Sequence, residues 1–348
     1  MLTTEPRQGS RWHALADRAL AGERIDRDDA LAVLRAPDEE LLDLLGAAYR
    51  VRRHFYGDTV KLNFLINAKS GICPEDCGYC SQSRVSTAEI PKYQLLSPEQ
   101  IVEQADRAVE LKASTCCIVI SARRPSQREL AGVTDAVRQV KERHPGLKVC
   151  ACLGLVDEDE ARALADAGVE RYNHNLNTAE EHYGSICSTH TYEDRVATVG
   201  AVAAAGISPC SGLIVGMGES DEQLVDVAFA LNEVGAESIP VNFLIPIEGT
   251  PLGDAGRRGI DPRFGLKVLA MVRLVNPDRE IRLSAGREVH FGSLQPLGLY
   301  PANAIFVADY LTEPGQPASE DLRMIEDLGF TVEALGTPIG PIAEPVSS

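Results

Sequence analysis

Short apolar segments alternate with amphipathic helical segments along most of this chain, and this alternation limits its fold more than any other feature. Helical patterns such as "TYEDRVATVGAVAAAG" and "DEQLVDVAFALNEVG" open on Thr or Asp and close on Gly, as helices do. Eight strand–helix units predict an α/β fold with a parallel sheet closed into a (β/α)8 TIM-type barrel, with a doubly wound open sheet as the alternative. The expected strands are 61–68, 114–121, 147–154, 170–176, 208–216, 238–246, 280–286 and 303–309.

The two ends of the chain differ from this central part. Residues 1–60 are charged and carry apolar positions at three- and four-residue steps, which predicts an N-terminal helical extension. The barrel is expected over residues 61–330. Residues 331–348 end in the Pro- and Ser-rich sequence "GTPIGPIAEPVSS", which predicts a loose C-terminal tail.

The charge balance restricts the partners of this chain. Lys and Arg number 34 against 51 Asp and Glu, a formal net charge of -17, which repels nucleic-acid phosphates and anionic membranes. The N-terminal sequence has no apolar signal-peptide core, and no apolar run is long enough to span a membrane. We therefore expect a cytoplasmic protein that binds neither nucleic acid nor membrane. Its nine cysteines are then expected to bind metal, do redox chemistry or pack in the core.

Three of these cysteines, Cys73, Cys77 and Cys80, lie close together in "GICPEDCGYCSQS", directly after the first expected strand. Pro74 and Gly78 between them favour a loop around a ligand over a helix. A closed zinc site would need a fourth ligand or a second cysteine pair, and the spacing differs from that of bacterial ferredoxins. Three thiolates would leave one iron of a 4Fe-4S cluster free to bind a substrate or cofactor.

Small and polar residues share one face of several expected strands. Because strand side chains alternate between faces, Asn173, Asn175 and Asn177 fall on one face, with His174 opposite. Bulky branched side chains normally fill a barrel, so such faces predict a polar cavity with a ligand. Each Asn alone also fits a strand end, and each cysteine a small buried hydrophobe, but the buried charge of Arg282 favours a second site. On the other expected strands, the residues that share such a face are Cys117, Val119 and Ser121; Cys150, Cys152 and Gly154; Cys210, Gly212 and Ile214; and Arg282 with Ser284.

Five sequence blocks together resemble the biotin synthase family of the radical S-adenosylmethionine (SAM) superfamily, whose signature is the CxxxCxxC spacing. They are "CPEDCGYCSQS", "YNHNLNT", "CSGLIVGMGES", "VNFLIPIEGTPL" and "RLSAGRE". The resemblance implies conversion of dethiobiotin to biotin by sulfur insertion between C6 and C9. A 5′-deoxyadenosyl radical made from SAM would remove the two hydrogens, and a 2Fe-2S cluster would supply the sulfur. No side chain is expected to act as acid, base or nucleophile.

The same resemblance implies which residues hold the two clusters. Three cysteines of the loop would bind the 4Fe-4S cluster, whose free iron takes the amino and carboxylate groups of SAM. Cys117, preceding "IVIS", and Cys150, three residues before the Leu of "LG", are assigned in preference to their neighbours. Cys116, Cys152 and Cys187 are expected to be non-ligands. The implied ligand sets are Cys73, Cys77 and Cys80 for the 4Fe-4S cluster, and Cys117, Cys150, Cys210 and Arg282 for the 2Fe-2S cluster.

The resemblance further implies contacts to SAM and dethiobiotin. Tyr79 and Ile214 would flank the adenine, and Arg195 would meet the SAM carboxylate, which suits a guanidinium. Amides match both the N–H donors and the carbonyl of a ureido ring. Asn175 and Asn177 would reach the ribose of SAM, while Asn173, Asn175 and Asn242 would hold the ureido ring of dethiobiotin.

Family members also suggest partners for this chain. The resemblance implies a homodimer and a flavodoxin or ferredoxin as electron donor. Both donors are acidic and would need a basic patch, for which "RVRRHF" at 50–55 is a candidate, although it equally fits a solvated helix face. The alternatives are another radical SAM enzyme, such as a hydrogenase-maturation or lipoyl-type enzyme, and a non-catalytic iron–sulfur scaffold. Lipoyl synthases have a further cysteine motif before the radical loop, whereas residues 1–72 contain no cysteine.

Overall fold

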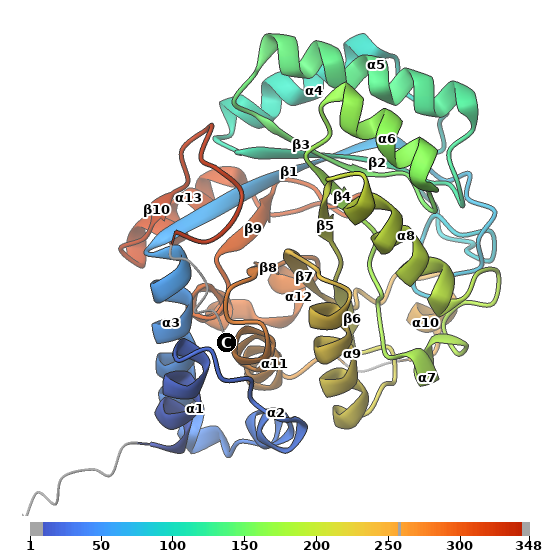
Figure 1. Cartoon of the computed structure of the whole chain (residues 1–348). Coiled ribbons are helices and arrows are strands. Elements are labelled where there is room, and N and C mark those ends of the chain that lie inside the picture. Colours follow the sequence, from blue (N-terminus) through green and yellow to red (C-terminus); the bar gives the residue numbers. More distant parts are fainter. Residues whose placement is uncertain (1–9, 257–258, 343–348) are drawn as a thin grey trace, which may run out of the picture.

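A ring of parallel strands surrounded by helices forms the centre of the computed structural model, which describes residues 10–256 and 259–342 (Figure 1). The strands pair in the order β1-β2-β3-β4-β5-β7-β8-β9, and β9 pairs with β1, which closes the ring. This closure confirms the predicted TIM-type barrel and rules out the open sheet. The strands are β1 (Thr59–Lys69), β2 (Thr115–Ile120), β3 (Lys148–Cys152), β4 (Arg171–Asn173), β5 (Ser208–Cys210), β6 (Leu213–Val215), β7 (Ser238–Phe243), β8 (Glu280–Leu283) and β9 (Ala304–Val307).

The segment expected as one strand over 208–216 is divided into β5 and β6, and both pair with β7. The division lies at Ser211 and Gly212. A Cβ atom at Gly212 would lie 2.0 Å from the carbonyl oxygen of Pro240 in β7, so only glycine permits this approach. The break turns the chain between Cys210 and Ile214, two of the predicted site residues.

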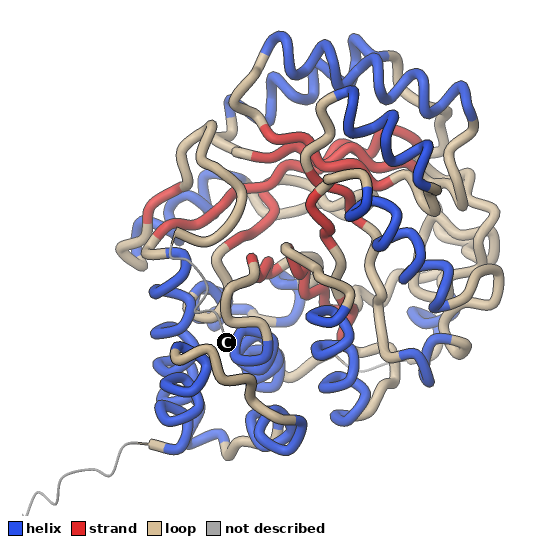
Figure 2. Tube along the Cα trace, in the orientation of Figure 1, coloured by secondary structure: helices blue, strands red, loops and turns tan. Residues whose placement is uncertain are grey.

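Helices cover the outside of the ring, as the blue segments around the red strands in Figure 2 show. Several helices begin with a capping box, in which the N-cap side chain accepts a hydrogen bond from the backbone of the third helical residue and the side chain of that residue accepts one from the N-cap backbone. The N-cap residues of these helices include Ser97, Ser126, Asp157, Thr191 and Ser220. The helices are α1 (Arg11–Leu20), α2 (Arg27–Leu34), α3 (Leu41–Tyr56), α4 (Pro98–Glu110), α5 (Gln127–Arg143), α6 (Glu158–Ala167), α7 (Glu180–Tyr183), α8 (Tyr192–Ala204), α9 (Asp221–Glu233), α10 (Pro251–Asp254), α11 (Pro262–Val275), α12 (Arg287–His290) and α13 (Ala318–Asp327), with 3₁₀ turns at Asp38–Glu40 and Gly292–Leu299.

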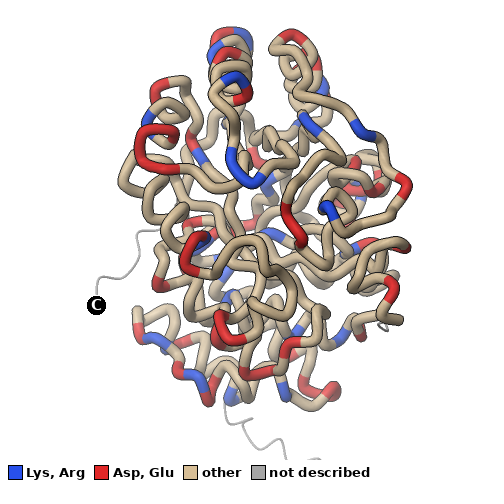
Figure 3. Tube along the Cα trace, turned by 90° about the vertical axis from the view of Figure 1, so that its right-hand side faces the viewer, with Lys and Arg blue, Asp and Glu red and all other residues tan. Residues whose placement is uncertain are grey.

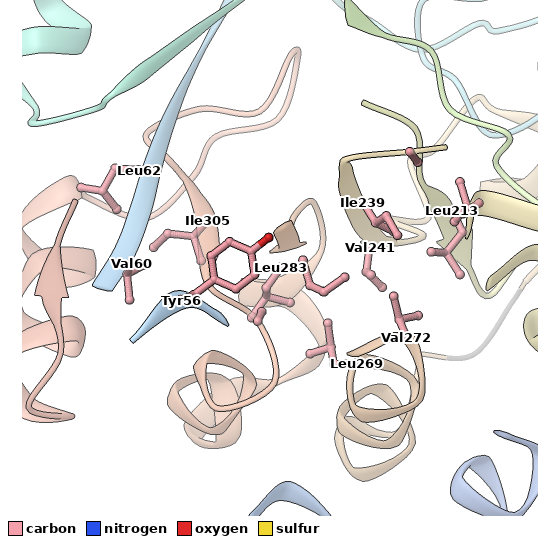
Figure 4. Packing of buried hydrophobic residues seen from close by; sticks show 14 of the residues in the cluster. Tyr56, Val60, Leu62, Leu213, Ile239, Val241, Leu269, Val272, Leu283 and Ile305 are labelled. Atoms are coloured by element: carbon pink, nitrogen blue, oxygen red, sulfur yellow. The ribbon is translucent and has the colours of Figure 1, made fainter. Parts of the chain in front are cut away.

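Apolar side chains on the outer faces of β7 and β8 pack against α11. Figure 4 shows Val241 and Leu283 of these strands near Leu269 and Val272 of the helix, and all four are fully buried. Burying one such side chain stabilises a fold by about 2 kcal/mol. Since neighbouring strand residues point to opposite faces, this packing holds Arg282 toward the barrel interior.

The segment expected to be a loose tail differs from that expectation at its start. Strand β10 (Thr331–Val332) pairs with the first residues of β1, and the backbone N–H of Glu333 bonds Val60. Further along, the N–H of Ile342 bonds the carbonyl oxygen of Phe55 at 2.7 Å. Strand β1 begins before its barrel neighbours do and so offers a free backbone edge. Residues 343–348 of the predicted tail lie outside the described part.

The candidate basic patch at residues 50–55 lies only partly on the surface, where Arg50, Arg53 and His54 are exposed, and its docking role stays a prediction. Arg52 is fully buried, its guanidinium donating to the carbonyl oxygens of Gly57 and Thr59. The Arg52 guanidinium is therefore not available to a partner protein, and a helical sequence pattern could not reveal its burial. In Figure 3, Lys and Arg positions are interspersed with Asp and Glu. The described helices include none long and apolar enough to cross a bilayer.

Candidate functional site

A cavity of about 290 Å³ extends into the barrel from the carboxyl ends of its strands. Its wall contains residues at or just after the ends of β1 to β4 and β6 to β9, together with the cysteine loop. Of the predicted site residues, Cys150 and Cys210 are fully buried outside this lining. The others line the cavity: Cys73, Cys77, Tyr79, Cys80, Cys117, Asn173, Asn175, Asn177, Arg195, Ile214, Asn242 and Arg282.

The cysteine loop is held from both sides by backbone hydrogen bonds. The N–H of Gly78 bonds the carbonyl oxygen of Ile186 at 2.8 Å, and the carbonyl oxygen of Gly78 accepts from Leu252 at 2.9 Å. Cys77 is buried, whereas Cys73 and Cys80 remain partly exposed. The three thiols therefore belong to a fixed loop at the cavity, as a three-cysteine cluster site requires.

Segment 186–190 provides further contacts to this loop. The Asp76 carboxylate accepts hydrogen bonds from the backbone N–H groups of Ser188 and Thr189, at 2.9 and 3.2 Å. Burial raises the pKa of this carboxyl, but the hydrogen bonds from Ser188 outweigh it and hold the pKa well below its usual range. Asp76 thus stays ionised and anchors the loop between Cys73 and Cys77.

Cys187, predicted to be a non-ligand, lies beside the cysteine loop. Its Sγ is 3.7 Å from Cys77 Sγ and 3.3 Å from His190 Nδ1. These three residues could hold a metal ion, since their ligand atoms all lie within 4.8 Å of one another. A hydrogen bond from the Cys77 thiol lowers the pKa of Cys187 to about 4, against burial, which raises it. Sequence spacing gave no sign of this proximity.

Three residues predicted to contact the nucleoside of SAM are joined by hydrogen bonds. The amide of Asn177 donates to the Tyr79 hydroxyl at 2.7 Å, and the backbone N–H of Ile214 donates to the Asn177 carbonyl oxygen at 2.8 Å. Asn177 has a φ of 70°, a left-handed conformation that asparagine adopts more readily than most residues. Asn177, which follows β4 in the chain, thereby links Tyr79 of the cysteine loop to Ile214 of β6.

Arg195, on α8, is buried and lines the cavity wall. Its Nη1 donates to the carbonyl oxygen of Asn175 at 2.6 Å, its Nη2 contacts His190 Nε2 at 2.8 Å, and its Nε donates to the Tyr183 hydroxyl. A guanidinium has five N–H donors. The donors that these contacts leave over are available to an anionic group in the cavity, such as a carboxylate.

The deeper predicted cysteines come together inside the barrel. Cys117 and Cys150 are register partners on β2 and β3, and the single hydrogen of the Cys150 thiol can be shared with Cys117 or with Cys210. The bond from Cys150, and after it the positive charge of Arg282, lowers the pKa of Cys210 to about 5, although burial opposes this. A thiolate is therefore favoured at a fully buried position.

A cluster of buried charges lies next to these thiols. The Glu280 carboxylate accepts from Arg282 Nη2 at 2.9 Å, from Arg171 Nη1 at 2.7 Å and from Lys61 Nζ at 2.9 Å. Three cations thus meet one carboxylate, with Glu333 reaching Lys61 only at 3.7 Å. Such an excess of buried positive charge needs an anion nearby.

Two N–H groups of this charge cluster test whether an iron–sulfur cluster would fit. Arg282 Nε and Arg171 Nη2 are buried and have no hydrogen-bond partner. Buried donors are nearly always paired, so an acceptor is expected beside them. An anionic cluster held by three thiolates would supply both the acceptor and the missing negative charge, and the residues therefore fit the predicted 2Fe-2S site.

The predicted substrate amides lie between the two cysteine groups. Asn173 Nδ2 donates to Asn175 Oδ1 at 2.9 Å and contacts Cys210 Sγ at 3.3 Å. Across the cavity, the Asn242 amide donates to the Leu213 carbonyl oxygen at 3.1 Å and accepts from the Tyr310 hydroxyl at 3.1 Å. These contacts fix the direction of each amide in the cavity.

Sequence reasoning missed several residues of the site. The alternation of faces placed His174 away from the amides, but β4 ends at Asn173, and His174 lines the cavity with its Nε2 unpaired. Burial, and after it the charge of Arg195, keeps the pKa of His174 well below its usual value. Tyr310 and Glu280 were also missed, because their partners are distant in sequence. The sequence did contain one signal for Glu280: it stands two residues before Arg282 on the same strand, so the two side chains share a face.

Comparisons with known proteins agree with this geometry. The family model of the Radical SAM superfamily matches residues 68–231, and that of the Biotin and Thiamin Synthesis associated domain matches residues 240–331. Among solved structures, methylornithine synthase superposes with a TM-score of 0.81 at 22% identity, covering 92% of this chain and 98% of that one. The hydrogenase maturase HydG from Carboxydothermus hydrogenoformans gives a TM-score of 0.78 at 17% identity, covering 92% and 79%. These two show the fold.

Curated relatives are much more similar in sequence. Biotin synthase of Bacillus cytotoxicus is 56% identical over 322 residues, which cover 92% of this chain and 96% of the relative. Biotin synthase of Bacillus subtilis is 52% identical over 326 residues, covering 94% and 96%. Identity at this level over nearly the whole of both proteins leaves one conclusion. The chain belongs to the biotin synthase family.

Proposed function

We propose that this chain converts dethiobiotin to biotin by inserting a sulfur atom between C6 and C9. The observation that carries the proposal is a group of three cysteines in the loop at the cavity and a second group deeper in the barrel, of which Cys117 lines the cavity and Cys150 and Cys210 are buried behind it, with a row of amides between the groups. The C–H bonds at C6 and C9 are unactivated, so acids and bases cannot break them usefully at neutral pH. A radical reaction with a nearby sulfur source can.

The two cysteine groups have different proposed roles. Cys73, Cys77 and Cys80 would hold a 4Fe-4S cluster, and the deeper thiols with Arg282 a 2Fe-2S cluster. When bound, the clusters and SAM supply the 5′-deoxyadenosyl radical and the inserted sulfur. Arg282 is held by Glu280 and Ser238 through its Nη2, at 2.9 and 3.1 Å, which keeps its guanidinium beside the thiols.

The remaining site residues would bind and orient the two small molecules. Tyr79 and Ile214 would flank the adenine, Asn175 and Asn177 would reach the ribose, and Arg195 would bind the carboxylate of SAM. Asn173, Asn175 and Asn242 would hold the ureido ring of dethiobiotin, since amides pair with both its donors and its carbonyl. Their task is to fix the distance between C–H bonds and radical and to keep water out.

The organisation and partners of the protein complete the proposal. Residues 61–330 would form the catalytic barrel and residues 1–60 an extension of it. We propose a homodimer as the working unit, a flavodoxin or ferredoxin as the electron donor, and the cytoplasm as the location. These statements rest on the family relationship and on the low-potential electron that cleavage of SAM requires.

Anaerobic reconstitution tests the proposal. The protein loaded with iron and sulfide is incubated with SAM, dethiobiotin and a strong reductant, and 5′-deoxyadenosine and biotin are measured. We expect both products, with about one biotin per smaller cluster unless sulfide is replaced. Formation of 5′-deoxyadenosine without biotin would indicate another radical SAM enzyme. The absence of both products would indicate an iron–sulfur scaffold.

A further inference from the structure

His190 connects the cavity arginine to the cysteine loop. Its Nε2 lies 2.8 Å from Arg195 Nη2, and its Nδ1 lies 2.6 Å from Glu75 Oε2. All three side chains are buried, so water does not compete for these contacts. Glu75 stands between Cys73 and Cys77 in the sequence, and the connection therefore runs from the cavity wall to the middle of the loop.

The chemistry of the two partners fixes the proton of this imidazole. A guanidinium only donates hydrogen bonds, so Nε2 of His190 must be the acceptor toward Arg195. Nδ1 then carries the hydrogen of the neutral ring and donates to the Glu75 carboxylate. One tautomer satisfies both contacts, and Glu75 selects it.

The contact with His190 is one of three that set the plane of the Arg195 guanidinium. The carbonyl oxygen of Asn175 and the hydroxyl of Tyr183 hold the other two nitrogens. An arginine side chain has many rotamers, and a planar fork binds a carboxylate well only when its plane is fixed. Without His190, Nη2 of Arg195 would lose its protein acceptor. The guanidinium plane would then be held by two contacts instead of three.

Glu75 is itself fixed by the same segment that carries His190. The Thr189 hydroxyl donates to Glu75 Oε2, and the backbone N–H of Asp76 donates to the Thr189 oxygen at 3.2 Å. Glu75 is therefore a rigid acceptor, and the orientation it gives to the imidazole is a fixed one. The contacts join residues more than a hundred positions apart in the sequence.

We propose that His190 is a positioning residue for SAM: it aims Arg195 at the SAM carboxylate and is held in the required tautomer by Glu75. The inference rests on the proposed function, because it takes Arg195 as the partner of that carboxylate. His190 does not touch the reacting atoms. Its loss would weaken SAM binding without affecting dethiobiotin binding or cluster content.

Two substitutions separate the two contacts of His190. His190→Gln can place an oxygen acceptor near the position of Nε2, which keeps the contact with Arg195. His190→Asn can place an N–H donor near the position of Nδ1, which keeps the contact with Glu75 but ends short of Arg195. His144→Asn is the matched control, because His144 also pairs with a carboxylate, Asp106 at 2.6 Å, but does not line the cavity.

Equilibrium binding of SAM to the cluster-loaded protein is the measurement, with iron content and dethiobiotin binding determined on the same samples. We expect the Kd for SAM to rise about tenfold in His190→Asn and to change by less than about threefold in His190→Gln. The control should bind SAM as the unaltered protein does.

Three results would overturn the positioning role. They are unchanged SAM affinity in His190→Asn, a larger loss in His190→Gln than in His190→Asn, and a loss of affinity that only follows a loss of iron. Failure of the proposed function looks different, because the unaltered, cluster-loaded protein would then make no biotin from dethiobiotin, whatever its affinity for SAM.

Discussion

Single residues in the barrel interior carry an unusual amount of charge. Glu280 pairs with Lys61, Arg171 and Arg282 at once, and the thiols of Cys117, Cys150 and Cys210 lie beside Arg282. Each of these groups would be costly alone in a low-dielectric interior. Each cation contacts the Glu280 carboxylate, and the positive charge left over is available to an anionic cluster at the thiols.

Cys210→Ala should separate the two clusters spectroscopically. The substitution removes a thiol that contacts Asn173 and Cys150, far along the sequence from the cysteine loop. We expect the reconstituted variant to lose the visible absorption of the 2Fe-2S cluster and to keep the 4Fe-4S signal. Retention of both signals would show that the deep ligand assignment is wrong, and Cys116→Ala, which alters a predicted non-ligand, is the control.

Glu280→Gln should destabilise the fold strongly. It leaves three buried cations without their shared carboxylate, and breaking a buried ion pair in this way costs about 3–5 kcal/mol. Urea unfolding of the cluster-free protein measures the change. Glu158→Gln removes an equally charged but exposed carboxylate and should alter the free energy of unfolding by less than about 0.5 kcal/mol. Equal effects of the two substitutions would contradict the compensating role.

Among the structural elements, the cysteine loop and segment 186–190 form one unit. A hydrogen bond from the Gly78 N–H to Ile186 and one from the Ser188 N–H to Asp76 bring Cys187 beside Cys77. The nearness of a fourth thiol raises the question of whether it is a ligand. The predicted assignment says that it is not.

Cys187→Ala tests that assignment. We expect the iron and sulfide bound per chain to stay the same, whereas Cys77→Ala should lose the 4Fe-4S cluster. Iron analysis and electron paramagnetic resonance of the reduced proteins provide the measurement. Loss of the cluster in both variants would make Cys187 a fourth ligand.

The break between β5 and β6 should be intolerant of a side chain. Gly212→Ala would place a Cβ 2.0 Å from the Pro240 carbonyl oxygen and push β7 away from Cys210. Thermal unfolding should begin at a lower temperature than in the unaltered protein, and the content of the smaller cluster should fall. Gly200→Ala is the control, because a Cβ there would meet no atom outside its own stretch of helix within 4 Å, and alanine favours the interior of α8. Similar unfolding temperatures in both variants would refute the constraint.

At the scale of the whole molecule, the alternation of strands and helices was sufficient to predict the barrel, because it depends on local periodicity. The three-cysteine loop was equally visible, since its ligands are neighbours in sequence. Local patterns could not reveal where β4 ends, so His174 was assigned to the wrong face. Nor could they reveal the burial of Arg52 or the contact between His190 and Glu75, because each depends on chain segments that meet only after folding.

Removal of the clusters should lower the stability of the whole barrel. A ligand that binds only the folded state stabilises it, and the unpaired donors of Arg171 and Arg282 would lose their acceptor. We expect anaerobic calorimetry to give a lower unfolding temperature for the chelator-treated protein than for the loaded one. Identical temperatures would mean that neither cluster contributes to the fold.

The ion cluster around Glu280 lies behind the cavity and meets it at Arg282. Lys61, Arg171 and Glu280 are almost fully buried and fill the barrel interior next to the deep thiols. The cavity extends from there toward the carboxyl ends of the strands, where dethiobiotin would enter. If iron and sulfide reach the deep thiols through this cavity, a bound substrate would lie in their path, and reloading of the proposed 2Fe-2S cluster would wait until the cavity is empty.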